Sequence, residues 1–137
     1  PPAEPHAMLA ECAAVVIAAP ASPETHHLID AAALKAIPRH AILVNVARGS
    51  LVDEQELARV MRDEPLAAAI LDVFDPEPLD PGSPLWDIPN VYISAHCSIS
   101  LDRYVDDVFD QFFDNLERFL AGEQLKNTVD MKSHGFE

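Results

Sequence analysis

The sequence is short of positive charge and of cysteine. Its 137 residues contain 23 Asp and Glu against 9 Lys and Arg, a formal net charge of −14. Such a chain would be repelled at long range by a phosphate backbone or an anionic membrane surface. Cys12 and Cys97 are the only cysteines, too few for a disulfide framework and not in metal-ligand spacing. We therefore expect no nucleic-acid partner, no membrane partner and no bound metal, in a reducing compartment with the cytoplasm as the default.

Long apolar runs are also missing. No stretch approaches the roughly 20 residues of a membrane-spanning helix, and the run from Ala13 to Ala19 lacks the basic flank of a signal peptide. With 49% hydrophobic and 23% charged residues, the composition is that of a soluble globular domain. The chain begins Pro1-Pro2 rather than with Met, and a candidate strand follows soon after, so we expect further sequence upstream.

What the sequence does contain is a series of short apolar runs: AAVVIAA from Ala13, AILVNVA from Ala41, LAAAILDV from Leu66 and VYISA from Val91. The runs do not alternate apolar with polar residues, so each is expected to be buried on both faces, as in a parallel sheet covered by helices. The predicted fold is therefore α/β, with about four parallel strands joined by crossover connections.

The connections support this prediction in part. Asp30 can start a short helix that ends at Pro38. Asp53 can cap a second helix that runs to about Arg62, with an inner face of Leu57, Val60 and Met61. The third connection, residues 75–90, holds five of the twelve prolines, which predicts an extended loop rather than a helix.

Beyond the fourth run, apolar residues at steps of three and four predict a long amphipathic helix that ends near Gly122. Residues 123–137 have few apolar side chains, so they are expected to dock elsewhere or to hang loose. The apolar positions are Tyr104, Val105, Val108, Phe109, Phe112, Leu116 and Phe119.

Polar side chains follow the predicted strands where each strand ends. Arg48 follows the second, Asp72 and then Glu77 follow the third, and His96 follows the fourth. Because parallel strands end at one edge of a sheet, and open α/β sheets bind ligands beyond that edge, these residues are expected to converge. The convergence indicates a functional site.

Each residue alone leaves alternatives open. Arg48 could form an ordinary surface ion pair, or, beside Gly49, hold a carboxylate through two hydrogen bonds. Asp72 could cap the following turn or contact a cofactor, and Glu77 could be a solvated loop carboxylate. His96 could be a half-buried histidine, or a general acid/base with a carboxylate in reach.

Longer segments carry a family resemblance. VNVARGSLVDEQEL, AAAILDVFDPEPL, PLWDIPNVYISAHC and NLERFLAGEQLKNTVD together resemble the D-isomer-specific 2-hydroxyacid dehydrogenases, in order along nearly the whole chain. The resemblance implies the second half of a Rossmann-like doubly wound parallel sheet with a long C-terminal helix. Residues 1–122 would then be a partial dinucleotide-binding domain, and residues 123–137 a tail that returns to a substrate domain.

Carried over by position, the resemblance implies roles for particular residues. Arg48 matches the catalytic arginine, Glu77 the glutamate and His96 the proton-transferring histidine, with Asp72 at the nicotinamide carboxamide. The implied reaction is hydride transfer between NAD or NADP and a 2-hydroxy acid/2-keto acid pair. The other matched cofactor-binding positions are Ala18, Ala19, Pro20, Thr25, Val46, Ala47 and Ser98, while Arg48 and His96 also line the cofactor site.

Several positions depart from the family pattern. Ala95 stands where the family usually has proline, and Ser98 and Ile99 stand where glycine or alanine is common. The four glycines cannot form the G-x-G-x-x-G turn that cradles a pyrophosphate. We therefore expect a fragment that is inactive alone. Two other readings stay open: a non-catalytic binding module, and a truncated product that pairs its sheet edge with a second copy as a homodimer.

Overall fold

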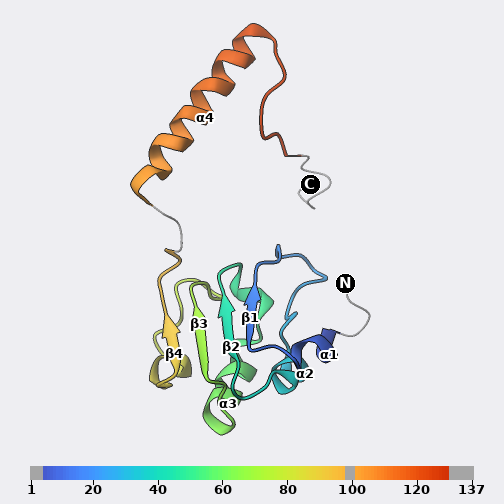
Figure 1. The fold of residues 1–137 in the computed structure, drawn as a ribbon. Coiled ribbons are helices and arrows are strands. Elements are labelled where there is room, and N and C mark those ends of the chain that lie inside the picture. The colour runs from blue at the N-terminus through green and yellow to red at the C-terminus, as the bar shows by residue number, and fades with distance from the viewer. Residues whose placement is uncertain (1–4, 98–100, 130–137) are drawn as a thin grey trace. The chain divides into compact units, whose positions relative to one another are not determined.

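The computed structural model describes residues 5–97 and 101–129. The chain divides into two compact units, one ending at Ser98 and the other starting at Ile99. We call them the sheet unit and the helix unit and describe each by itself (Figure 1). The prediction that residues 123–137 return to a substrate domain is not addressed by this division and stays a prediction.

The sheet unit contains one parallel sheet. Its strands are β1 (Ala14–Ile17), β2 (Ile42–Asn45), β3 (Ala68–Leu71) and β4 (Val91–Ile93), in the order β1-β2-β3-β4. All three pairings are parallel, and their register aligns Val16, Val44, Ile70 and Tyr92 across the sheet. The predicted parallel α/β fold is confirmed, and all four strands end at the same edge (Figure 1).

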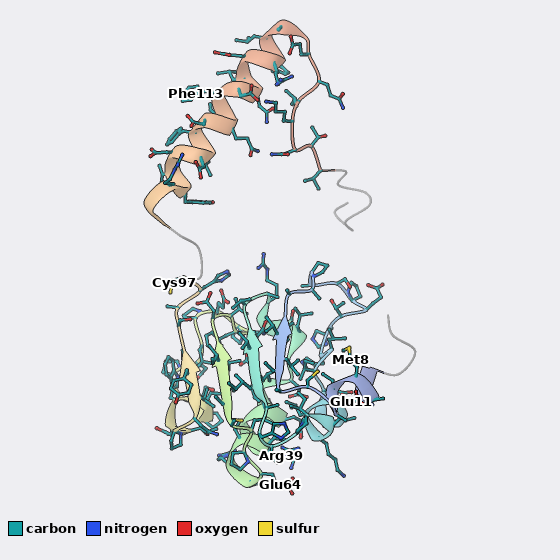
Figure 2. The ribbon with its side chains drawn as sticks, viewed as in Figure 1. Met8, Glu11, Arg39, Glu64, Cys97 and Phe113 are labelled. Carbon is teal, nitrogen blue, oxygen red and sulfur yellow. The ribbon has the colours of Figure 1, made fainter. Side chains whose placement is uncertain are left out.

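Helices connect the strands and begin where the sequence predicts. Helix α2 (Ala31–Ala36) is capped by Asp30, which accepts from the Ala33 amide, and α3 (Glu54–Asp63) by Asp53, which accepts from the Glu56 amide. Arg39 ties these connections together, because its Nη1 donates to the Glu64 carbonyl oxygen at 2.7 Å (Figure 2). A short helix α1 (Pro5–Leu9) precedes β1 and was not expected from the sequence.

The sheet is covered on one face within its unit. Leu43, Ala69 and Leu71 share one buried cluster with Leu34 of α2 and Leu57 of α3. On the opposite face the apolar side chains are exposed: Val16 61%, Ile42 36%, Ile70 39% and Tyr92 58%. The expectation of strands buried on both faces is therefore wrong for this unit. An apolar strand sequence places apolar side chains on both faces of the sheet. It does not show which of the two faces the helices of the same unit cover.

The remaining connections are short turns and an extended loop. A 3-10 turn η1 (Gly49–Leu51) follows β2, and a second, η2 (Pro84–Asp87), interrupts the proline-rich loop. The prediction of an extended segment in place of a crossover α-helix is confirmed, with η2 as a single helical turn that the sequence did not indicate.

The helix unit consists of α4 (Leu101–Ala121) and the chain that follows it. Gly122 ends the helix with φ 71°, a left-handed conformation that favours glycine. Residues up to 129 then fold back along the polar side of α4, where Lys126 Nζ lies 3.0 Å from Asp114 Oδ2 and the Lys126 amide donates to Asn115 Oδ1. From Tyr104 onward, the apolar side chains of α4, including Phe113, are exposed (Figure 2).

Candidate active site

The turn after β2 carries Arg48, and the buried side-chain amide of Asn45 supports its backbone. Asn45 is 1% exposed; its Nδ2 donates to the Arg48 carbonyl oxygen at 2.9 Å, and its Oδ1 accepts from the Ala47 amide at 3.1 Å. The Arg48 guanidinium remains exposed, with Nη1 donating to the Ala47 carbonyl oxygen at 2.6 Å. The backbone beneath the guanidinium is thus fixed while its charge stays available to an anion.

Gly49 lets this turn approach the chain that leaves β3. A Cβ placed on Gly49 would lie 1.9 Å from the Phe74 carbonyl carbon and 2.4 Å from the Asp75 nitrogen. Only a residue without a side chain fits there. The close approach brings Arg48 next to the loop that carries Glu77.

Glu77 and His96 form a contact pair. The Nδ1 of His96 lies 2.8 Å from Glu77 Oε2, and Glu77 Oε1 accepts from the Phe74 amide at 3.0 Å. These hydrogen bonds, first the one from His96 and then the one from Phe74, lower the pKa of Glu77, and the nearby charge of Arg48 acts in the same direction. Glu77 is therefore held as a carboxylate facing the imidazole.

A hollow of about 360 Å³ at the carboxyl ends of the strands joins the three residues. The structure brings together Arg48, Glu77 and His96, which the sequence places on three separate connections. The residues that line the hollow are Ala21, Arg48, Gly49, Ser50, Phe74, Asp75, Glu77 and His96. A cation, a carboxylate and an imidazole around one hollow can bind an acid and exchange a proton with it.

Asp72 is not part of the lining of this hollow. It is 3% exposed, and its Oδ1 accepts from Ser94 Oγ at 2.5 Å and from the Cys97 amide at 3.0 Å. These contacts connect the residue after β3 to the segment after β4, which carries Cys97 (Figure 2). A contact between Asp72 and a nicotinamide carboxamide stays a prediction.

The other predicted cofactor positions within the described residues lie at the same edge of the sheet. Ala18, Ala19 and Pro20 follow β1, and Thr25 closes their loop by donating from Oγ1 to the Pro20 carbonyl oxygen at 2.8 Å. After β2, Val46 is 42% exposed although it is apolar. Ser98, also predicted to bind the cofactor, lies outside the described residues.

Two polar residues near the site did not stand out in the sequence. Asn45 supports the backbone of Arg48, and Ser94 donates to Asp72. Each is the single polar residue inside an apolar run, AILVNVA and VYISA. That signal was available, because a polar side chain within a strand needs a partner when it is buried.

Other kinds of site have less support. In residues 5–97 and 101–129, no group of three or more His, Cys, Asp or Glu side chains is arranged to hold a metal ion. Cys12 and Cys97 are free thiols. None of the helices in the same residues combines the length and apolarity of a membrane span.

A four-stranded parallel sheet with a polar site at its carboxyl edge is the architecture of a nucleotide-binding α/β domain. Residues 2–98 match the model of the D-isomer specific 2-hydroxyacid dehydrogenase NAD binding domain. The chain belongs to this family, as the resemblance implied, and the family's NAD-binding domain accounts for the sheet unit.

Individual relatives agree with this assignment. The chain is 38% identical over 122 residues to the glyoxylate/hydroxypyruvate reductase B of Pectobacterium atrosepticum, covering 89% of this chain and 38% of that protein. It is 35% identical over 118 residues to the glycerate dehydrogenase of Methylorubrum extorquens, covering 85% of this chain and 38% of that protein. The chain thus spans well under half the length of these curated relatives.

Solved structures show the same likeness. A D-isomer specific 2-hydroxyacid dehydrogenase from Xanthobacter autotrophicus Py2, in complex with NADPH and MES, is 41% identical with a TM-score of 0.79; the match covers 93% of this chain and 52% of that one. An NADPH-dependent glyoxylate/hydroxypyruvate reductase from Sinorhizobium meliloti, in complex with NADP and sulfate, is 31% identical with a TM-score of 0.80, over 92% of this chain and 41% of that one.

Proposed function

We propose that this chain is part of an oxidoreductase that transfers a hydride between NAD or NADP and C2 of a 2-hydroxy acid/2-keto acid pair. The observation that carries the proposal is the hollow around which Arg48, Glu77 and His96 meet, in a chain that belongs to the 2-hydroxyacid dehydrogenase family. Membership of this family also supports a small-molecule substrate. It is compatible with a homodimer and with a location in the cytoplasm, and both are part of the proposal.

The proposed catalytic roles follow from the chemistry of each side chain. The exposed guanidinium of Arg48 binds the carboxylate of the acid through paired, charge-assisted hydrogen bonds and so orients its C2 oxygen. His96 Nδ1 is taken by Glu77, so Nε2 is the nitrogen that gives a proton to the C2 oxygen or takes one from it. The Glu77 carboxylate stabilises the imidazolium form.

The residues present fit the nicotinamide side of the cofactor. Val46 offers an exposed apolar side chain and Ala47 a small one at the end of β2, suited to the flat face of an aromatic ring. When bound, the nicotinamide supplies or accepts the hydride. The loop of Ala18, Ala19, Pro20 and Thr25 is proposed to line the adenosine side.

The substrate class is proposed from the relatives. Two of the similar proteins are named glyoxylate/hydroxypyruvate reductases and one is named a glycerate dehydrogenase. Glyoxylate and hydroxypyruvate are therefore the first 2-keto acids to test, each with NADH and with NADPH.

Arg48 provides the test of substrate binding. In the full-length protein, Arg48→Ala is expected to lower kcat/KM for the keto acid at least about 100-fold, because charge-assisted hydrogen bonds contribute about 1.5–3 kcal/mol each. Arg59→Ala is the matched control, since Arg59 pairs with Glu56 on α3, and it should leave kcat/KM unchanged. Turnover that is insensitive to Arg48→Ala would contradict the proposal, and cofactor binding without any turnover would favour a non-catalytic module.

A further inference from the structure

His96 has a backbone conformation that is rare for a residue with a side chain. Its φ is 52°, in the left-handed region, which places Cβ close to the following carbonyl oxygen. A residue keeps such a conformation only where its surroundings impose it. The direction of the imidazole toward Glu77 depends on this backbone, so the contacts that impose it matter for the proton-transfer pair.

Those contacts converge on Asp72. The His96 amide donates to the Asp72 carbonyl oxygen at 2.8 Å, and the next amide, that of Cys97, donates to the Asp72 carboxylate at 3.0 Å. One residue therefore holds two successive peptide groups on either side of the left-handed position.

Ser94 completes the arrangement from the other side of the histidine. Its hydroxyl donates to the same Asp72 Oδ1, and its amide donates to the Leu71 carbonyl oxygen at 3.0 Å. A carboxylate that is 3% exposed requires hydrogen-bond donors in the protein interior. The Ser94 hydroxyl is one such donor.

We propose that Asp72 and Ser94 are positioning residues for His96: Asp72 fixes the left-handed backbone that aims the imidazole at Glu77, and Ser94 holds the Asp72 carboxylate in place. The assignment adds a role to Asp72 beyond cofactor contact. It rests on the proposed function only for its effect on turnover, because the Glu77–His96 contact can be measured without any reaction.

The Glu77 pKa reports on this contact directly, because the hydrogen bond from His96 is the largest cause that lowers it. Carboxyl carbon NMR of the 137-residue chain follows the Glu77 titration. Asp72→Ala is expected to raise the pKa of Glu77 toward its ordinary value, because the His96 imidazole would no longer be held in contact with the Glu77 carboxylate. Asp72→Asn keeps a side-chain oxygen for the Cys97 amide and should keep the Glu77 pKa low.

The sign of the change separates positioning from simple electrostatics. Removing a nearby negative charge without any movement would lower the pKa of a neighbouring carboxyl or leave it unchanged. An Asp72→Ala variant whose Glu77 pKa does not rise would therefore overturn the proposal. If that variant does not fold, Ser94→Val and Ser94→Thr give the same test at similar volume: the Glu77 pKa should rise in the first and stay low in the second, and equal values would overturn it.

A control and a turnover measurement complete the design. Cys97→Ala keeps the amide that Asp72 accepts from and should leave the Glu77 titration unchanged. In the full-length protein, Asp72→Ala should lower kcat by up to about 100-fold, the cost of a small misplacement of a catalytic group, and Ser94→Val should act in the same direction. If the wild-type protein does not turn over 2-keto acids, the proposed function fails. The NMR titration would still test whether Asp72 and Ser94 position His96.

Discussion

In the sheet unit Leu34, Leu43 and Leu57 are completely buried, whereas on α4 Phe109, Phe112 and Phe119 are 54%, 56% and 70% exposed. Polar groups differ between the two units in the same way. Asn45 and Asp72 are buried and hydrogen-bonded in the sheet unit, while the ion pairs of α4 with the chain after it lie at the surface. The sheet unit thus contains both its own core and the candidate site, and α4 contributes little buried apolar area within its unit.

This difference predicts where the stability of the chain resides. Burial of apolar side chains is the main favourable contribution to folding, and surface ion pairs contribute about 0–1 kcal/mol each. Substitutions in the sheet unit should therefore be costly and equivalent ones on α4 should not.

The largest expected effect is at the centre of the sheet unit. Leu57→Ala should lower the free energy of unfolding by about 2–5 kcal/mol, because it removes a fully buried side chain and leaves a cavity. Urea denaturation followed by circular dichroism measures the change. A loss below about 0.5 kcal/mol, the size typical of a surface position, would contradict the difference in stability between the two units.

The next effect concerns the close approach under the site. Gly49→Ala should lower the free energy of unfolding by about 1–3 kcal/mol, since its Cβ would overlap the Phe74 backbone. Gly82→Ala is the matched control: its Cβ would meet only the Asp80 side chain, at 3.1 Å, and stability should change by less than about 0.5 kcal/mol. Equal effects at the two glycines would show that the turn after β2 is not packed against Phe74.

A smaller effect depends on pH. Folding lowers the pKa of Glu77, so the stabilisation is fully present above the ordinary glutamate pKa and is lost as the pH falls through the lowered value. Glu77→Gln should therefore be less stable than the wild type at neutral pH, and the difference should shrink below roughly pH 4. Denaturation midpoints across this range provide the measurement, and a difference that grows toward low pH would reverse the assigned sign.

The smallest expected effect is on α4. Phe119→Ala should change the free energy of unfolding of this chain by less than about 0.5 kcal/mol, because Phe119 is 70% exposed. The same denaturation experiment applies. A loss as large as that of Leu57→Ala would mean that α4 packs against a partner in solution.

The fold was predictable because its signals are local. Asp30 and Asp53 start helices where their side chains can cap free amides, and Gly122 ends α4 where a left-handed residue is required. Apolar runs predicted the strands, but the exposed side chains of Val16 and Tyr92 show that such runs do not reveal which face is covered.

Only the part of the site that follows from the order and direction of the strands was predictable. Parallel strands place Arg48 and His96 at one edge, and the structure joins them with Glu77 around one hollow. The sequence marks Asn45 and Ser94 as polar residues inside apolar runs, but it does not give their partners. Asn45 donates to the Arg48 carbonyl oxygen within the turn after β2, and Ser94 donates to Asp72, which follows β3. The catalytic roles themselves stay proposals.

The most direct test of the central claim is the turnover of His96→Gln in the full-length protein with a 2-keto acid and the nicotinamide cofactor. Loss of a positioned general acid should lower kcat by about 10²–10⁴-fold while cofactor binding is retained. Turnover of His96→Gln at the wild-type rate would contradict the account of this site.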